Sequence, residues 1–175
     1  MSTVLKTKSA TTWSKSLLCI VACSTVLHTQ AAEVMECQIA NYKSELLAAV
    51  NDVRAKGQVC GAAVGALALN DKLNSVAAAH SKDMANQQFF SHANIKGERI
   101  GKRARKFGYA YTVVGENIAA GQGSVAEVMD TWLNSPSHCG NIMTAEFVHM
   151  GISCQYNAKT EYQYYWTLTL GSPKP

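Results

Sequence analysis

Residues 148–156, VHMGISCQY, and residues 162–171, YQYYWTLTLG, decide the fold class of this chain. The second segment alternates apolar and polar residues with a period of two, which is typical of a β-strand with one buried face. The segment YNAKTE between them contains turn-forming residues, so the pair predicts a β-hairpin. One face of the second strand is expected to hold Tyr162, Tyr164, Trp166, Leu168 and Leu170.

The chain before this hairpin has mainly helical patterns. Apolar residues recur at helical spacing from Ile39 to Val53, and Gly57 marks the end of that helix. A second helix is predicted at 72–90, and its apolar face includes His80. Residues 60–70 are weak as a strand and favour an irregular connection.

Three further elements complete the pattern. A short basic helix is predicted at 99–107, and another helix at 125–133 ends before Pro136. Residues 111–120, YTVVGENIAA, indicate a strand that Gly115 interrupts. Helices, a strand, a helix and a hairpin in this order predict one layered α+β domain.

The N-terminal region predicts export. Three lysines precede an uncharged apolar run at 17–27, which is shorter than the roughly 20 residues of a membrane-spanning helix. Small residues follow, so residues 1–31 are expected to be a cleaved signal peptide and residues 32–175 the mature domain. The run IVAC before Ser24 gives an alternative, a lipoprotein anchored through Cys23.

The charge of the chain says little about its partners. The whole chain carries a net charge of +4, but its three leader lysines leave 13 Lys and Arg against 12 Asp and Glu after cleavage. The basic pI therefore belongs mostly to the leader, and nucleic acid is not implied. We expect a monomer without a transmembrane span in the mature chain.

Cysteines after the leader predict disulfides. Cys37, Cys60, Cys139 and Cys154 are even in number and lack metal-like CxxC spacing. In an exported chain this indicates two disulfides, with three pairings open.

Four polar residues are candidates for a site. His92 follows the second helix, and His138 lies in SPSH with Ser135 three residues before it. Glu116 interrupts an apolar strand, where a buried carboxylate is costly unless it is paired. It either caps backbone amides at Gly115 or faces a polar cleft with the two histidines, where they would suit a divalent metal.

Other polar residues favour structural interpretations. His80 is expected to be a core histidine bonded to backbone, and His149 is left as structural. Ser135 and His138 alone do not make a nucleophile, which also needs an orienting group and an oxyanion hole. The basic stretch ERIGKRARK is expected to be a solvated helix face, with attraction to an anionic envelope polymer or lipid as the alternative.

Five segments in order resemble one family. AAAHSKDMANQQFFSH, GENIAAG, WLNSPSHCGNIM, VHMGISC and YYWTLTLG are similar to blocks of the cysteine-rich secretory, antigen 5 and pathogenesis-related superfamily, in its bacterial SCP-like branch. The resemblance covers about residues 42–171 and implies a single-domain α-β-α sandwich. It also implies a central cleft with two histidines and two acidic residues that bind zinc or a similar divalent ion.

The resemblance assigns the cleft residues by motif. The histidines fall on His92 and His138, and the first acidic residue falls on Glu116. The second acidic position, three residues after Trp132, holds Ser135, so this chain lacks one carboxylate of the set. The resemblance further implies that Cys60 pairs with Cys139, leaving Cys37 to pair with Cys154.

Two functions follow as expectations. The first is a non-enzymatic binding module whose cleft, with or without Zn²⁺, takes an envelope, lipid or host protein ligand. The second is a secreted hydrolase, protease-like or esterase-like, that uses Glu116 or a histidine as base. A mainly structural role in the envelope is a third interpretation.

Overall fold

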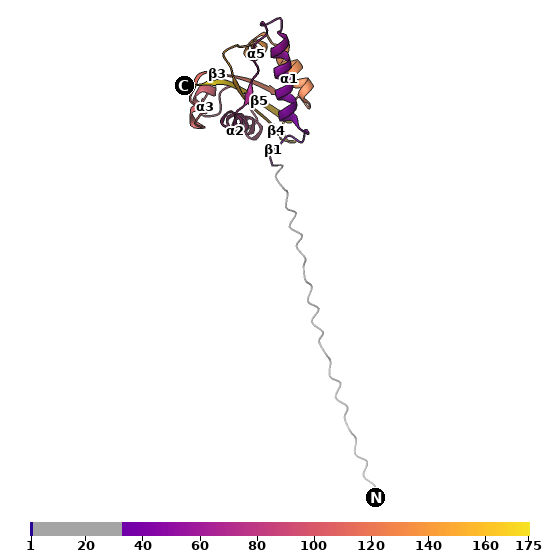
Figure 1. Ribbon diagram of the computed structural model, residues 1–175. Coiled ribbons are helices and arrows are strands. Elements are labelled where there is room, and N and C mark those ends of the chain that lie inside the picture. Colours follow the sequence, from indigo (N-terminus) through magenta and orange to yellow (C-terminus); the bar gives the residue numbers. More distant parts are fainter. Residues whose placement is uncertain (2–32) are drawn as a thin grey trace. The chain divides into compact units, whose positions relative to one another are not determined.

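The computed structural model describes Met1 and residues 33–175. Apart from Met1, the predicted leader lies outside the described residues, and so does the alternative lipid site at Cys23. Residues 33–175 form an α+β domain (Figure 1). Its elements in chain order are β1 (Met35–Glu36), α1 (Tyr42–Lys56), β2 (Ala68–Leu69), α2 (Asp71–Gln87), α3 (Ile100–Lys106), β3 (Tyr111–Ala120), α4 (Val125–Leu133), α5 (Pro136–Ile142), β4 (His149–Tyr156) and β5 (Tyr164–Pro173).

The sheet is mostly antiparallel, as predicted, and the hairpin forms its centre. Its strand order is β1-β4-β5-β3, and β2 adds a short parallel pairing to the start of β4. The hairpin pairs His149 with Gly171 and Tyr156 with Tyr164. Because β3 pairs only with β5, it leaves one edge of the sheet open to loops and helices.

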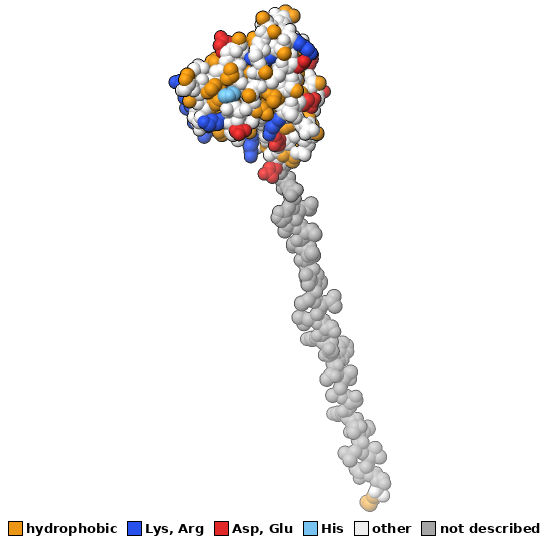
Figure 2. All heavy atoms as spheres, viewed as in Figure 1, with side chains coloured by type: hydrophobic (Ala, Val, Ile, Leu, Met, Phe, Trp, Pro, Cys, Tyr) orange, Lys and Arg blue, Asp and Glu red, His pale blue; other side chains and the backbone are white. Residues whose placement is uncertain are grey.

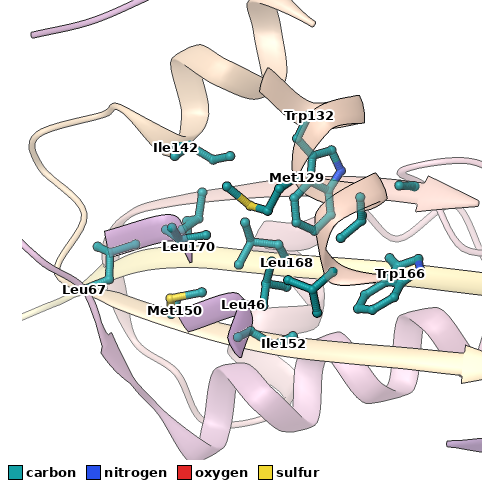
Figure 3. Packing of buried hydrophobic residues seen from close by; sticks show 14 of the residues in the cluster. Leu46, Leu67, Met129, Trp132, Ile142, Met150, Ile152, Trp166, Leu168 and Leu170 are labelled. Atoms are coloured by element: carbon teal, nitrogen blue, oxygen red, sulfur yellow. The ribbon is translucent and has the colours of Figure 1, made fainter. Parts of the chain in front are cut away.

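One face of the sheet is apolar and the other carries small and hydroxyl residues, and helices cover both faces. Even-numbered residues of β4 and β5, such as Met150 and Leu168, point into the main apolar core. Figure 1 shows α1 and α5 on one side of the strands and α2 and α3 on the other. Figure 3 shows Trp132 of α4 and Ile142 of α5 packed over these strand residues. The predicted α-β-α sandwich is confirmed.

The opposite face is built from small and hydroxyl residues, which let α2 approach closely. A Cβ on Gly151 would lie only 2.1 Å from the backbone carbon of Leu73. Beside it, Thr169 donates a hydrogen bond from its hydroxyl to the carbonyl of Leu73 at 3.0 Å. Ser81 and Ser153 bond through their hydroxyls at 2.8 Å. The α2 helix is therefore held to the sheet by short-range polar contacts as well as by packing.

Two disulfides close the domain with the pairing that the resemblance implied. Cys37–Cys154 joins the segment after β1 to β4, and Cys60–Cys139 joins the loop after α1 to α5. They span 117 and 79 residues, so both restrict the unfolded chain strongly.

Three details differ from the sequence predictions. The strand β3 runs through Gly115, whose missing side chain admits the ring of Phe147: a Cβ there would lie 2.8 Å from it. Residues 136–142, for which no helix was predicted, form the helix α5, because Pro136 fits the first turn of a helix. The last strand begins at Tyr164, and Tyr162 packs against Tyr165, away from the predicted face.

In the part of the chain described here, every helix is too short or too polar to cross a membrane.

Candidate functional site

The candidate site lies at the open edge of β3, where three separate segments meet. Glu116 sits in the middle of β3, paired with Thr169 of β5. His92 comes from the loop after α2, and His138 comes from α5. The rings of His92 and His138 lie 6.5 Å apart between centroids. We call His92, Glu116, Ser135 and His138 the histidine site.

The carboxylate of Glu116 is buried and fully engaged. Its side chain is 1% exposed, and Nδ1 of His92 donates to Oε1 at 3.0 Å. The second oxygen, Oε2, accepts a hydrogen bond from Nη2 of Arg103. Glu116 thus pairs with side chains rather than capping backbone amides, and of the two predicted imidazole partners it bonds only that of His92.

Arg103 corrects the prediction of a wholly solvated basic helix. Its side chain is 4% exposed, whereas its neighbours Lys102, Arg105 and Lys106 are exposed. Besides Glu116, its guanidinium donates to the carbonyls of His92 at 2.8 Å and Glu98 at 2.6 Å. Arg103 therefore fixes the His92 loop and neutralises the carboxylate beneath it.

His80 completes the buried side of this network. It is fully buried and donates from Nε2 to the carbonyl of Ser91 at 2.9 Å, as predicted for a core histidine. The same nitrogen lies 3.8 Å from Oε1 of Glu116. Burial lowers the pKa of His80, although the Glu116 charge opposes this shift. His80 thus remains neutral near pH 7 and supports the loop.

The opposite wall is α5, and two asparagines attach it to β3. Asn117 donates from Nδ2 to the carbonyl of His138 at 2.9 Å. Asn141 donates to Oδ1 of Asn117 at 2.9 Å and to the carbonyl of Glu116 at 3.3 Å. Because Asn117 is fully buried, these bonds fix the position of His138 relative to Glu116.

Ionisation within the site follows from these contacts. Burial raises the pKa of Glu116, but the His92 hydrogen bond and the Arg103 charge outweigh it and lower the pKa below its usual value. Burial and the neighbouring His92 lower the pKa of His138. At neutral pH the site therefore holds an ionised Glu116 and a neutral His138.

Ser135 lies at the N-terminal end of α5 and takes no part in the carboxylate network. Its hydroxyl bonds the hydroxyl of Ser137 at 3.2 Å. Within residues 33–175, Nδ1 of His138 is buried and has no hydrogen-bond partner, so Ser135 does not supply one. The spacing of SPSH places the two residues on one helix end without joining them.

These donors do not fit a zinc site as they are arranged. Zinc takes three or four His, Cys, Asp or Glu ligands. Among residues 33–175, no three such side chains gather closely enough to hold a metal ion. Glu116 is occupied by Arg103 and His92, which leaves two imidazoles beside a fixed guanidinium charge. Zinc binding by His92 and His138 stays a prediction.

Sequence reasoning missed Arg103, Asn117 and Asn141. A signal for Arg103 exists, because Ile100, Arg103, Ala104 and Phe107 follow the i, i+3, i+4, i+7 spacing of a buried helix stripe. A cation on that stripe needs a buried partner. The asparagines carry no comparable signal in the sequence.

Comparison with known proteins identifies the family. A model of the cysteine-rich secretory protein (CAP) family matches residues 47–170. The chain belongs to this family. The resemblance of the five sequence segments is thereby confirmed.

Bacterial relatives match parts of this CAP domain. The uncharacterized protein YkwD of Bacillus subtilis strain 168 is 35% identical over 86 residues, which cover 49% of this chain and 34% of YkwD. The uncharacterized membrane protein YlbC of the same strain is 30% identical over 77 residues, 44% of this chain and 22% of YlbC. The matched stretch thus spans about a third or less of these relatives.

Solved structures share the CAP architecture. An extracellular protein containing an SCP domain from Bacillus anthracis is 25% identical with a TM-score of 0.63, over 74% of this chain and 39% of that one. An outer surface protein from Borrelia burgdorferi is 18% identical with a TM-score of 0.71, over 81% of this chain and 100% of that one. The second likeness concerns the fold alone.

Proposed function

We propose that this chain is an exported, non-enzymatic binding module that recognises an envelope, lipid or host protein ligand through His92 and His138. One observation carries the proposal: both oxygens of Glu116 are engaged, by Arg103 and by His92. The only carboxylate of the site is thus a structural counter-ion. His92 and His138 would then contact a ligand through hydrogen bonds from their imidazole rings.

The two imidazoles are suited to direct recognition. The side chain of His92 is 40% exposed, and its Nδ1 is held by Glu116, so Nε2 is free to face a ligand. His138 is half-buried and its backbone is held by Asn117. Fixed, partly exposed hydrogen-bonding groups reduce the entropy lost on binding.

A metal-independent site is the form that the contacts favour. The guanidinium of Arg103 already supplies the positive charge that Glu116 needs, and a second cation at the same carboxylate would meet Coulomb repulsion. The alternative, a zinc ion held by His92 and His138, is tested by the titration below.

The hydrolase alternative receives less support from the geometry. A base must lie within hydrogen-bond reach of the proton that it removes. The carboxylate of Glu116 is 1% exposed and paired, and the hydroxyl of Ser135 bonds Ser137 rather than His138. The groups that a nucleophilic mechanism would join are therefore engaged elsewhere.

Export is supported by two features of this chain and its relatives. Two long-range disulfides are typical of proteins that fold in an oxidising compartment. The similar SCP-domain protein of Bacillus anthracis is described as extracellular. We propose a secreted or periplasmic protein, and the intact mass of the exported chain separates a free form from one lipidated at Cys23.

The test is a binding comparison of wild type with the His92→Ala/His138→Ala variant. Wild type should retain a component of envelope extracts, identified by mass spectrometry, that the double variant does not retain. Lys82→Ala/Lys159→Ala is the control, because it removes two exposed side chains that lie outside the histidine site, and it should bind like wild type. Equal retention by all three proteins rejects the histidine site as the ligand site.

Two further measurements separate the alternatives. Zinc titration by calorimetry on the same three proteins should give no heat that depends on His92 and His138. A saturable zinc signal lost only in the double variant would instead make the site a metal centre. Peptidase and esterase substrates should be turned over no faster by wild type than by the double variant, and a faster wild-type rate would favour the hydrolase.

A further inference from the structure

A polar pocket lies at the end of the sheet where β4 begins and β5 ends. Its volume is about 410 Å³, within the range of small-molecule sites. The first turn of α2, the loop before β3, His149 and residues 173–174 line it. We call it the His149 pocket, and none of its lining residues belongs to the histidine site.

A tyrosine–histidine pair forms one side of the pocket. The hydroxyl of Tyr109 lies 3.1 Å from Nδ1 of His149. Tyr109 is 3% exposed because Gly171 lets its ring pack directly on the strand, where a Cβ would lie 2.8 Å away. Burial raises the pKa of Tyr109 to about 12, so its phenol stays protonated at neutral pH.

This pair determines what His149 offers to the pocket. A Tyr109 phenol O–H that donates to Nδ1 of His149 selects the tautomer whose proton is on Nε2. His149 is partly exposed, so that N–H is available as a donor. In this tautomer His149 presents an N–H donor to the pocket that it lines with Tyr109.

The remaining polar lining is also rich in donors. Asn70 caps α2, its Oδ1 accepting from the amides of Lys72 and Leu73 at 3.1 and 3.2 Å, which leaves its side-chain NH₂ to donate elsewhere. Lys72 and Lys174 both line the pocket, and neither makes an ion pair within residues 33–175.

The charged side chains that line the pocket are positive overall. Asp71 supplies the acidic side chain of the lining, against two lysines. The N-terminal end of α2 adds the partial positive charge of a 17-residue helix. Figure 2 shows Lys and Arg side chains, with an acidic side chain between them, over the side where Figure 1 places α2 and α3.

We propose that the His149 pocket binds a small hydrophilic anion through a phosphate or carboxylate group. The oxyanion would accept from Nε2 of His149 and pair with Lys72 and Lys174, while the pocket volume admits the sugar-sized body that carries it. This site is independent of the histidine site, so its success or failure leaves the proposed function above unaffected.

The experiment is an NMR titration of the amide spectrum with inorganic phosphate, acetate, glucose 6-phosphate and glucose. Saturable shifts of Asp71, Ala110 and His149 are expected with the charged probes and not with glucose. Tighter binding of glucose 6-phosphate than of inorganic phosphate assigns the rest of the pocket to the sugar, and equal binding assigns an inorganic-anion site.

Matched variants decide whether binding is specific. Lys72→Ala/Lys174→Ala and His149→Gln should each weaken binding about tenfold or more, the effect of losing charge-assisted hydrogen bonds. Lys82→Ala/Lys159→Ala removes the same charge from exposed positions outside the pocket and should bind like wild type, as should His92→Ala/His138→Ala. An equal loss in the lysine control, equal shifts with glucose, or no saturable shift up to about 10 mM probe overturns the proposal.

Discussion

Arg103 and Glu116 form an ion pair from which water is excluded, with side chains 4% and 1% exposed. The pair links α3 to the open edge strand β3, and the same guanidinium holds the carbonyl of His92. The position of the His92 loop therefore depends on a buried charge pair rather than on apolar packing alone.

Replacing only one partner of this ion pair should lower the stability of the fold. Arg103→Met and Glu116→Gln should each lower the free energy of unfolding by about 3–5 kcal/mol, because an unpaired buried charge or dipole remains. The double variant should lose less than the sum, with a coupling of at least about 1 kcal/mol in urea unfolding. Lys102→Met, which removes an exposed lysine of the same helix from its contact with Glu98, should cost less than about 1 kcal/mol. Additive losses would contradict a coupled pair.

Arg54 is a second buried cation, and it positions the segment after α5. It is fully buried and donates to the carbonyls of Gly65, Ile142, Thr144 and Phe147 at 2.6–3.2 Å. Arg54→Met should reduce unfolding free energy by at least about 3 kcal/mol, since several buried carbonyls lose their donor. Lys56→Met, exposed on the same helix, is the control. If Arg54→Met unfolds at the same temperature as Lys56→Met, Arg54 does not stabilise this segment.

The two disulfides should differ in what their loss does to binding. Replacing either pair by serines should cost about 2–5 kcal/mol of stability. Cys139 is adjacent to His138 on α5, so the Cys60→Ser/Cys139→Ser variant should also retain less envelope ligand. The Cys37→Ser/Cys154→Ser variant should keep that binding at temperatures where it is folded. Equal binding by both variants would show that α5 is held well enough without its disulfide.

Close packing of α2 makes Gly151 sensitive to the smallest substitution. Gly151→Ala should destabilise the fold by about 1–3 kcal/mol or more, because its methyl group would overlap the backbone of Leu73. A Cβ at Gly140 in α5 meets no atom within 4 Å, so Gly140→Ala should leave stability equal or raise it by up to about 1 kcal/mol. Calorimetric unfolding of both variants measures the contrast, and equal midpoints would refute it.

Acid should weaken the fold partly through Glu98. The hydrogen bond from Lys106, and then that from Asn94, lower the pKa of Glu98 from 4.5 to about 2. A lowered folded-state pKa stabilises the native state above the unfolded value and loses that contribution as pH falls through the folded value. Stability of wild type should thus fall between pH 4.5 and pH 2 more steeply than that of Glu98→Gln. Parallel curves of unfolding midpoint against pH would exclude this contribution.

Sequence patterns predicted the helices and strands of the fold better than the hydrogen bonds and ion pairs of the histidine site. Alternation located β5 because one face of this strand meets the apolar core, and helical spacing located α2 with His80 inward. The strand β2 was missed because two residues are too few to show a period. Arg103 was assigned to solvent because its neighbours along the chain are cationic, whereas its burial depends on Glu116, 13 residues away.

The sequence by itself determined the α+β class, the hairpin, the family and the cysteines available for two disulfides, because these follow from local periodicity and from motifs in order. Only the tertiary structure decided the state of Glu116. Whether a carboxylate binds a metal, accepts a proton or neutralises an arginine depends on which groups lie within about 3–4 Å of it, and these come from segments far apart in the chain. Here the guanidinium of Arg103 in α3 pairs with Glu116, so the carboxylate neutralises an arginine instead of binding the metal that the motif alone would predict.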